Sequence, residues 1–259
     1  MRNLLYFLVF VSFYGFGQDQ KETEFLSKEK LSVQSIINID NFGVLYYLNN
    51  NIFYKKSDEL VISYNNLQLG NIYSINTFSP LKINVFYKDF NTVMILDNRL
   101  AEIFRIDFNK QQPFRNITRI STGNDNTIWL FNQDTQQLEL YDYKTNKTRA
   151  TTLPVVSEVL DLKSNFNECW LLTENYIYKY NYFGSLLLKL KNNGYTNLVE
   201  SNGDIFLQKG NKLFFLRKET DTILPISIPE LLIKQFFVTN ETLYIYDEEF
   251  LHKYQLITE

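Results

Sequence analysis

Residues 126–143 read NTIWLFNQDTQQLELYDY and contain two short strand patterns. The first is the apolar run Ile128–Phe131, which stops at a polar segment. The second is Leu138–Tyr141, in which apolar and polar residues alternate. A continuous apolar run is typical of a strand buried on both faces, and alternation is typical of a strand with one face nearer water. The ten-residue offset between the two starts fits two strands joined by a hairpin turn.

The same pair of runs occurs six times along the chain. The first runs start at residues 44, 93, 128, 169, 205 and 243, and each second run starts 8 to 10 residues later. The mean step is about 40 residues, which is the length of a four-stranded propeller blade. The pairs are Val44–Tyr47 and Ile52–Tyr54, Val93–Leu96 and Ile103–Ile106, Ile128–Phe131 and Leu138–Tyr141, Cys169–Leu172 and Ile177–Tyr180, Ile205–Gln208 and Leu213–Leu216, and Leu243–Tyr246 and Leu251–Tyr254.

The segments around each pair predict two more strands per unit. One strand precedes the pair, as in SIINIDNFG before Val44, and another follows it in most units, as in KTRATTL. We call the four strands A, B, C and D in chain order, and expect B to be buried and C to lie nearer water. Proline cannot donate a hydrogen bond inside a sheet, so we expect the five prolines to lie between a D strand and the next A strand. They are Pro80, Pro113, Pro154, Pro225 and Pro229.

The sixth unit stops after strand C, and residues 24–34 lie upstream of the first unit without a partner. We expect this segment to form the outermost strand of the last blade, because that pairing closes the ring and removes an exposed edge. The sequence therefore predicts an all-β fold, a six-bladed β-propeller of four-stranded antiparallel blades.

The strand rhythm of residues 24–259 resembles that of the NHL and TolB-like six-bladed propellers. The Gly-His and Trp-Asp pairs of Trp-Asp repeats and the Asp-box of sialidases are absent from these units. The resemblance therefore implies a shape and assigns no role to any residue. Propellers include enzymes, receptors and scaffolds, so the fold does not choose among these functions.

Residues 1–17, MRNLLYFLVFVSFYGFG, have the pattern of a secretory signal peptide. Arg2 supplies a positive start, Leu4–Tyr14 is apolar, and Gly15 and Gly17 precede the expected cleavage point. The apolar run is shorter than the roughly 20 residues that a membrane span needs, although an N-terminal anchor remains the alternative. We expect residues 18–259 to form one propeller domain without a membrane span, in the periplasm or outside the cell, where it can associate with the outer membrane.

The cysteine and charge content narrows the function classes. Cys169 is the single cysteine, so it cannot form an internal disulfide, and its apolar setting predicts a buried, inert thiol. No cysteine lies near the cleavage point, so we expect no lipid anchor. The 26 basic and 29 acidic residues are interspersed, without the basic stripe that nucleic-acid binding requires.

The sequence shows no catalytic, metal or cofactor constellation. His252 and Cys169 are single residues of their kinds, whereas zinc and iron sites use several such ligands. Neither a Gly-x-Ser-x-Gly elbow nor a phosphate-binding glycine loop is present. Two alternatives stay open. One is a calcium ion held by Asp40, Asp125 and Asp204 in A–B turns, and the other is a carboxylate pair acting on carbohydrate.

Three phenylalanines occupy turns that we assign as A–B turns, namely Phe42, Phe90 and Phe166. Equivalent turns of a propeller lie on one rim, and clustered exposed aromatics often mark a protein interface. These three residues are therefore a candidate interface. The alternative is that each ring folds under its own turn and packs on the adjacent blade.

These observations favour an exported cell-envelope propeller that binds another envelope protein and acts as a non-catalytic scaffold. Two other classes remain as alternatives. One is a carboxylate-based enzyme acting on carbohydrate, and the other is a sensor for a small ligand in the axial channel.

The signal-peptide pattern predicts that the mature chain starts at Gln18 and lies outside the cytoplasm. Amino-terminal sequencing of the protein from its native cells should return QDQKE. A cytoplasmic species that retains Met1 would contradict the assignment.

Overall fold

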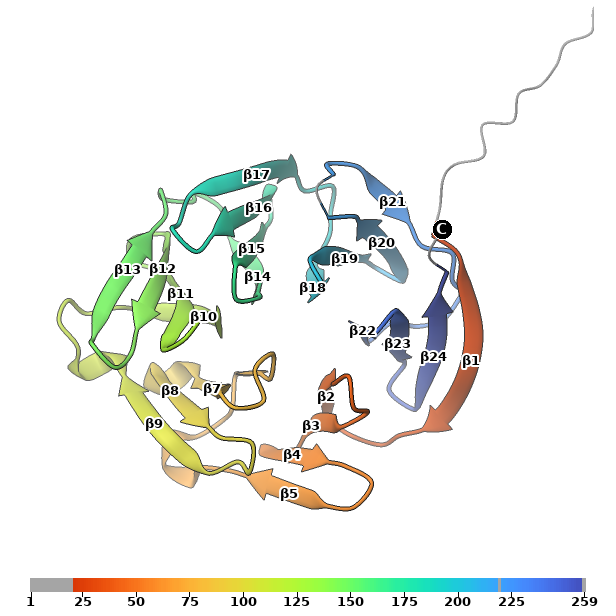
Figure 1. The fold of residues 1–259 in the computed structure, drawn as a ribbon, viewed down its shortest axis with the longest axis horizontal. Helices are drawn as coiled ribbons and strands as arrows, with labels where there is room; N and C mark the ends of the chain where they lie inside the picture. The colour runs from red at the N-terminus through yellow and green to blue at the C-terminus, as the bar shows by residue number, and fades with distance from the viewer. Residues whose placement is uncertain (1–20, 219, 258–259) are drawn as a thin grey trace, which may run out of the picture.

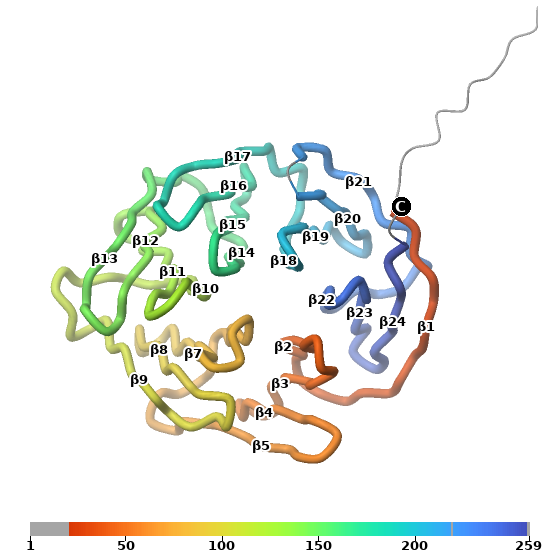
Figure 2. The backbone as a smooth tube through the Cα atoms, in the orientation of Figure 1, coloured from red at the N-terminus to blue at the C-terminus, as the bar shows by residue number. Residues whose placement is uncertain are grey.

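The computed structural model describes residues 21–218 and 220–257, which form a closed ring of six blades (Figures 1 and 2). Each blade is a four-stranded antiparallel sheet, with its A strand nearest the central axis and its D strand outermost. The six-bladed propeller predicted from the repeat is therefore confirmed. Only three single turns of 3₁₀ helix interrupt the β structure of the described residues.

The first three blades contain β2 (Ser35–Ile39), β3 (Leu45–Asn49), β4 (Ile52–Lys56) and β5 (Val61–Tyr64); β6 (Ser74–Asn76), β7 (Ile83–Tyr87), β8 (Thr92–Leu96) and β9 (Glu102–Asp107); and β10 (Ile117–Thr122), β11 (Thr127–Asn132), β12 (Gln137–Asp142) and β13 (Lys147–Thr151). The last three contain β14 (Val159–Ser164), β15 (Glu168–Thr173), β16 (Tyr176–Asn181) and β17 (Leu186–Lys191); β18 (Asn197–Ser201), β19 (Asp204–Lys209), β20 (Lys212–Leu216) and β21 (Ile223–Pro225); and β22 (Gln235–Thr239), β23 (Thr242–Tyr246), β24 (Phe250–Leu256) and β1 (Thr23–Lys30).

The hydrophobic core lies between the blades. Six clusters of buried residues fill the six seams between neighbouring blades of the described chain. Trp129 and Cys169, for example, share the seam between the third and fourth blades. Both B and C strands are buried there, and exposed positions alternate mainly on outer strands such as β13. The C strands lie outside the B strands as expected. In the third and fourth blades, however, neither face of the C strand is nearer water, because the neighbouring blades cover both.

Amide side chains in two of the turns between B and C strands tie a blade to the next. The Asn51 side chain donates to the Gly70 carbonyl at 2.9 Å and accepts from the Ile72 amide at 2.7 Å. Asn91 makes the same pair of bonds to Arg115 and Ile117, one blade further on. Both asparagines have positive φ, a conformation that asparagine tolerates better than most residues. These two Asn-bearing turns therefore fasten blades together as well as reverse the chain.

β1 closes the ring by pairing with β24 in the antiparallel sense, from Thr23 opposite Leu256 to Lys30 opposite Phe250 (Figure 1). This is the position expected for residues 24–34, although the strand ends at Lys30. Lys28 also places its ammonium 3.8 Å from the Phe250 ring centre. The N-terminal segment thus supplies the outermost strand of the sixth blade.

The second blade differs from its sequence assignment by one strand. β7, β8 and β9 are its B, C and D strands, whereas the sequence reading made them A, B and C. The true A strand, β6, has only three residues, which is too short to give a period-two pattern. The correction shortens the first repeat, since the B strands of the first two blades start at Leu45 and Ile83.

This shift also corrects two proline positions. Pro80 lies between β6 and β7, inside the second blade, and Pro225 is the last residue of the D strand β21. Both sites are compatible with proline, because one is a turn and the other is an outer edge strand. Pro113, Pro154 and Pro229 lie between blades as expected. Within the described ranges, no helix is long and apolar enough to cross a membrane.

Ring closure predicts that removing β1 destabilises the whole propeller. A chain that starts at Ser35 should melt roughly 10 °C below one that starts at Gln18, because a domain of this size loses about 2–4 °C per kcal/mol. Differential scanning calorimetry measures the difference. A third chain that keeps residues 18–34 in scrambled order should melt like the shortened one. Equal melting temperatures for all three would show that the segment adds nothing to the fold.

Candidate functional site

The antiparallel blades give the ring two distinct faces. One face carries the turns from A to B and from C to D strands, and we call it the A–B face. The opposite face carries the B to C turns and the connections between blades, and we call it the B–C face. Turn side chains from different blades can meet only if their turns lie on the same face.

Two of the three phenylalanines predicted to share a rim do so. Phe42 lies between β2 and β3 and is 90% exposed, and Phe166 lies between β14 and β15 and is 47% exposed. Both are on the A–B face. Phe90 lies between β7 and β8 in a single 3₁₀ turn, so it is on the B–C face. The prediction that it joins the other two was wrong, because it relied on the misassigned strands of the second blade.

Phe166 belongs to a groove of about 700 Å³ on the A–B face. Turns of the second, third and fourth blades and the start of β9 form its walls. We call it the aromatic groove. Its apolar lining residues are Leu81, Ile103, Phe104, Tyr143 and Phe166, and its polar lining residues are Ser79, Lys82, Asn124, Asp125, Asn126 and Lys144.

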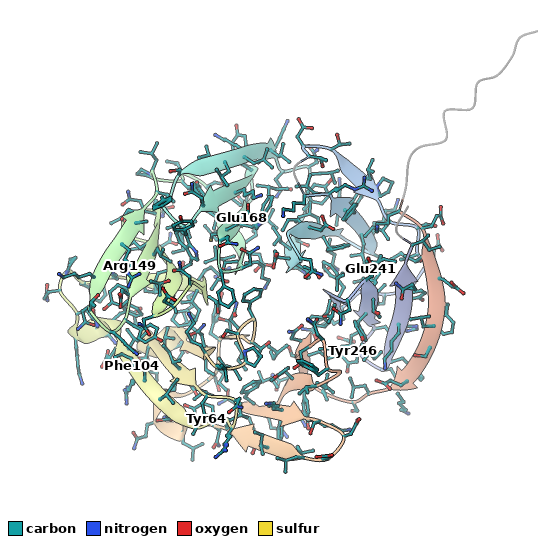
Figure 3. The ribbon with its side chains drawn as sticks, in the orientation of Figure 1. Tyr64, Phe104, Arg149, Glu168, Glu241 and Tyr246 are labelled. Atoms are coloured by element: carbon teal, nitrogen blue, oxygen red, sulfur yellow. The ribbon has the colours of Figure 1, made fainter. Side chains whose placement is uncertain are left out.

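Ring contacts join the walls of the aromatic groove. Phe104 of the second blade, labelled in Figure 3, lies beside Tyr143 of the third, and their ring centres are 5.0 Å apart. Phe166 meets Phe78 edge-to-face at 5.0 Å, and Phe78 also lines the axial channel. The Phe78–Phe166 pair therefore stands between the groove and the channel mouth.

Local hydrogen bonds hold the aromatic side chains outward. The Asn165 side chain accepts from the amides of Asn167 and Glu168, both at 2.9 Å, so its turn is fixed with Phe166 at the tip. The Asp97 carboxylate accepts from Arg99 and Ala101 in the turn that leads into β9. Such turns are set by the sequence and do not need a ligand to form.

Lys82 fixes the floor of the groove. It is only 7% exposed, and its ammonium donates to the carbonyls of Gly123, Asp125 and Thr127 at 2.7, 2.8 and 3.0 Å. Burial lowers the pKa of Lys82 to about 8, so the amine is still mostly protonated at pH 7. One side chain of the second blade thus satisfies three backbone acceptors of the third.

The axial channel encloses about 430 Å³ and is lined mainly by A strands. Its charged lining residues are Asp161, Lys163, Glu200 and Lys234. Asp161 lies 3.3 Å from Lys163, and Lys234 lies 2.6 Å from Glu248. Apolar residues such as Phe78 and Phe237 occupy much of the remaining wall. The channel therefore mixes both charges with apolar surface and does not gather carboxylates.

Glu200 is a channel residue whose pKa is perturbed by burial. Burial raises the pKa of its carboxyl group, against hydrogen bonds from the Asn165 side chain at 2.9 Å and the Gly203 amide at 2.8 Å. The carboxyl group also ties the fourth blade to the fifth. A carboxyl group with a raised pKa is one of the two parts that a carboxylate-pair hydrolase needs.

The single histidine and the single cysteine, His252 and Cys169, do not line the groove or the channel. His252 lies on β24, where its Nε2 is 2.8 Å from the Asp247 carboxylate. Burial raises the pKa of the Cys169 thiol well above its ordinary value, which leaves it unreactive.

The three turn aspartates weighed as calcium ligands are not brought together. Asp40 accepts from the amides of Phe42 and Val44, Asp204 accepts from the amide of Lys218, and Asp125 lines the aromatic groove. Across the part of the chain that the structure describes, no group of three or more His, Cys, Asp or Glu side chains could hold a metal ion. Of the three, Asp40 is the one whose carboxylate bonds within its own turn.

Sequence reasoning missed most of the aromatic groove. Phe104 was assigned to a half-buried C strand, and it lies on the outermost strand of its blade. Leu81 follows a proline in an A–B turn that was not recognised as one. The spacing of the apolar runs carries a signal of this shift. The first two runs start 49 residues apart, whereas the other runs start 35 to 41 residues apart.

Solved structures similar to this chain share its fold at low sequence identity. A streptogramin B lyase structure is 14% identical, with a TM-score of 0.64 over 90% of this chain and 88% of the lyase. A catalytically inactive virginiamycin B lyase from Staphylococcus aureus with quinupristin is 14% identical, with a TM-score of 0.60 over 86% of this chain and 80% of that chain. BamB from Moraxella catarrhalis is 15% identical, with a TM-score of 0.52 over 85% of this chain and 69% of that chain.

No protein-family model and no curated protein sequence matches this chain. At 14–15% identity, the structural likenesses establish the propeller fold alone. The inactive lyase carries a histidine-to-alanine substitution. The single histidine of this chain, His252, is on a C strand and does not line the axial channel.

The bonds of Lys82 predict that Lys82→Met destabilises the propeller by roughly 2 kcal/mol or more, because the buried carbonyls of Gly123 and Thr127 and the part-buried carbonyl of Asp125 lose a charged donor. Urea unfolding measures the change. Lys144→Met is the matched control, since this exposed lysine lines the same groove and its loss should cost less than about 0.5 kcal/mol. Equal stability of the two variants would show that the three bonds contribute nothing.

Proposed function

We propose that this chain is an exported propeller of the cell envelope that binds another envelope protein through its A–B face and acts as a non-catalytic scaffold. The observation that carries the proposal is the aromatic groove. Five apolar side chains from three blades line it, and Phe42 is exposed on the same face. Apolar surface of this kind is costly to leave in water and is typical of protein-binding sites.

The rigidity of the face supports a binding role. The groove walls are fixed by ring contacts, by capped turns and by the three bonds of Lys82. A preformed site loses little conformational entropy when its partner binds. Membership of a protein assembly is also known for this shape, since a chain of a mitotic checkpoint complex has a TM-score of 0.60 with this one at 11% identity, covering 100% of this chain and 99% of that chain.

The proposed location rests on residues 1–17, which lie outside the described residues. Their charged start, apolar run and small residues have the order of a secretory signal. The chain also does without disulfides, because its single cysteine is buried in a seam between blades. Its stability outside the cytoplasm would come from the six packed seams and the closing strand.

A second candidate is a carboxylate-based enzyme acting on carbohydrate in the axial channel. The raised pKa of Glu200 and the presence of Asp161 in the same channel favour it. In that case Glu200 is the general acid, and Glu200→Gln should abolish hydrolysis of oligosaccharides while leaving the fold intact. The scaffold function predicts that this substitution leaves partner binding unchanged.

The scaffold proposal predicts that substitutions on one face abolish partner capture. The mature chain, immobilised and crosslinked in solubilised native envelope, should capture a specific protein. Phe42→Ser with Phe166→Ser should reduce that capture at least tenfold while the melting temperature falls only slightly, because both side chains are substantially exposed.

Phe90→Ser is the matched control, since it removes a half-exposed phenylalanine from the B–C face. Capture should survive this change. Loss of capture with Phe90→Ser alone would move the interface to the other face. A large fall in the melting temperature of the Phe42 and Phe166 variant would instead identify these side chains as core residues.

A further inference from the structure

We infer that the aromatic groove accepts an extended, acidic segment of a partner protein, which pairs with the outer edge of β9 as an added strand. The inference rests on the proposed function in taking the partner to be a protein. It adds the secondary structure and the charge of the segment that binds. Strand addition draws on main-chain hydrogen bonds, with side-chain pockets giving specificity.

The outer edge of β9 is not paired with another strand of the described chain. Within the described residues β9 pairs with β8 and with no other strand, so the backbone groups along its outer edge have no strand partner. Every blade has such an outer strand, but β9 is the least protected. β5 and β21 are short, with four and three residues, and the remaining outer strands each carry two cations that discourage pairing. Those cations are Lys28 and Lys30 on β1, Lys147 and Arg149 on β13, and Lys189 and Lys191 on β17.

An apolar surface lies beside that edge. β9 has six residues, of which Ile103 and Phe104 are 52% and 36% exposed. Its one cation is Arg105, and its two carboxylates already have partners, since Glu102 accepts from Tyr64 and Asp107 pairs with Lys110. Ile103 and Phe104 line the aromatic groove together with Leu81, Tyr143 and Phe166. A strand added to β9 would place alternate side chains on one side of the sheet, because side chains alternate along a strand, and those opposite Ile103 and Phe104 would meet this groove. The groove therefore matches an extended segment with apolar residues at alternate positions.

The aromatic groove also carries charged side chains. The charged residues that line the groove are Lys82, Asp125 and Lys144, two cations and one carboxylate, on a chain whose net charge is −3. Asp125 lies close enough to Lys82 to interact electrostatically with it. Lys144 is exposed and has no ion-pair partner among residues 21–218 and 220–257. The groove is thus locally positive, and a carboxylate on the added segment would pair with Lys144.

A selection experiment tests the inference with peptides of defined length. A phage-displayed library of random nonapeptides is selected on the mature chain and counter-selected on a Leu81→Ser, Phe104→Ser variant. The enriched sequences should show apolar residues at alternate positions with Asp or Glu between them. The best peptide, labelled with fluorescein, should bind the wild-type chain in an anisotropy titration and bind the Lys144→Glu variant at least tenfold more weakly.

Lys212→Glu is the matched control, because it reverses an exposed lysine at the B–C end of the fifth blade. It should leave the affinity unchanged. Binding should also weaken as salt is raised, since the Lys144 contact is exposed to solvent. Enriched peptides without acidic residues, or with equal affinity for wild-type and Lys144→Glu chains, overturn the inference. Failure to enrich any peptide over the counter-selection overturns it as well.

Sedimentation velocity separates a second copy of this chain from a different partner. The wild-type chain should sediment as a monomer. If it dimerises and the Leu81→Ser, Phe104→Ser variant does not, the groove binds a second copy and the inference is wrong.

Failure of the scaffold function and failure of strand addition at β9 give different results. If envelope capture survives in the Leu81→Ser, Phe104→Ser variant, the scaffold function stands and strand addition at β9 fails. If the selected peptide binds but no envelope protein is captured, the groove stands and the scaffold function fails.

Discussion

The structure depends on closure at the seam between the sixth and first blades. This seam has the smallest hydrophobic cluster of the described chain, with Ile36, Ile39, Tyr246 and Leu251 as its buried residues. Polar bonds add to it. The Gln235 side chain accepts from the Ile36 amide at 2.8 Å and donates to the Ile36 carbonyl at 2.9 Å, as a neighbouring strand would. A ring in which each blade is covered by its neighbours leaves two blades exposed if one seam opens, so these contacts hold the fold as a whole.

Closure also explains why the A–B face can present a preformed site. Lys82 binds three carbonyls of the next blade, and Asn76 bonds to Ser121 and Thr122 across the same seam. Ser164 reaches the same pair of residues from the fourth blade. The turns of three blades are therefore held in one arrangement before any partner arrives. Packing alone is non-directional, whereas these hydrogen bonds set the angles between blades.

The candidate site could be predicted from the sequence only in part. Phe42 and Phe166 were found because each stands in a polar, Asn-bearing turn between two readable strands. Phe90 was placed on the wrong face because β6 is too short to read, and that single error moved every later strand of the blade by one position. Strand patterns do not predict the contact between Phe104 and Tyr143, since it joins residues of different blades.

The all-β class, the six repeats, the four-stranded blade and the need for residues 24–34 to complete the last one follow from the amino-acid sequence, because strand periodicity, turn residues and repeat spacing are local signals. The packed ring was needed to establish which turns share a face, which strand is outermost in the second blade, and which side chains line the aromatic groove. Those facts depend on how neighbouring blades stack, and that stacking brings together residues about 20 to 85 positions apart along the chain.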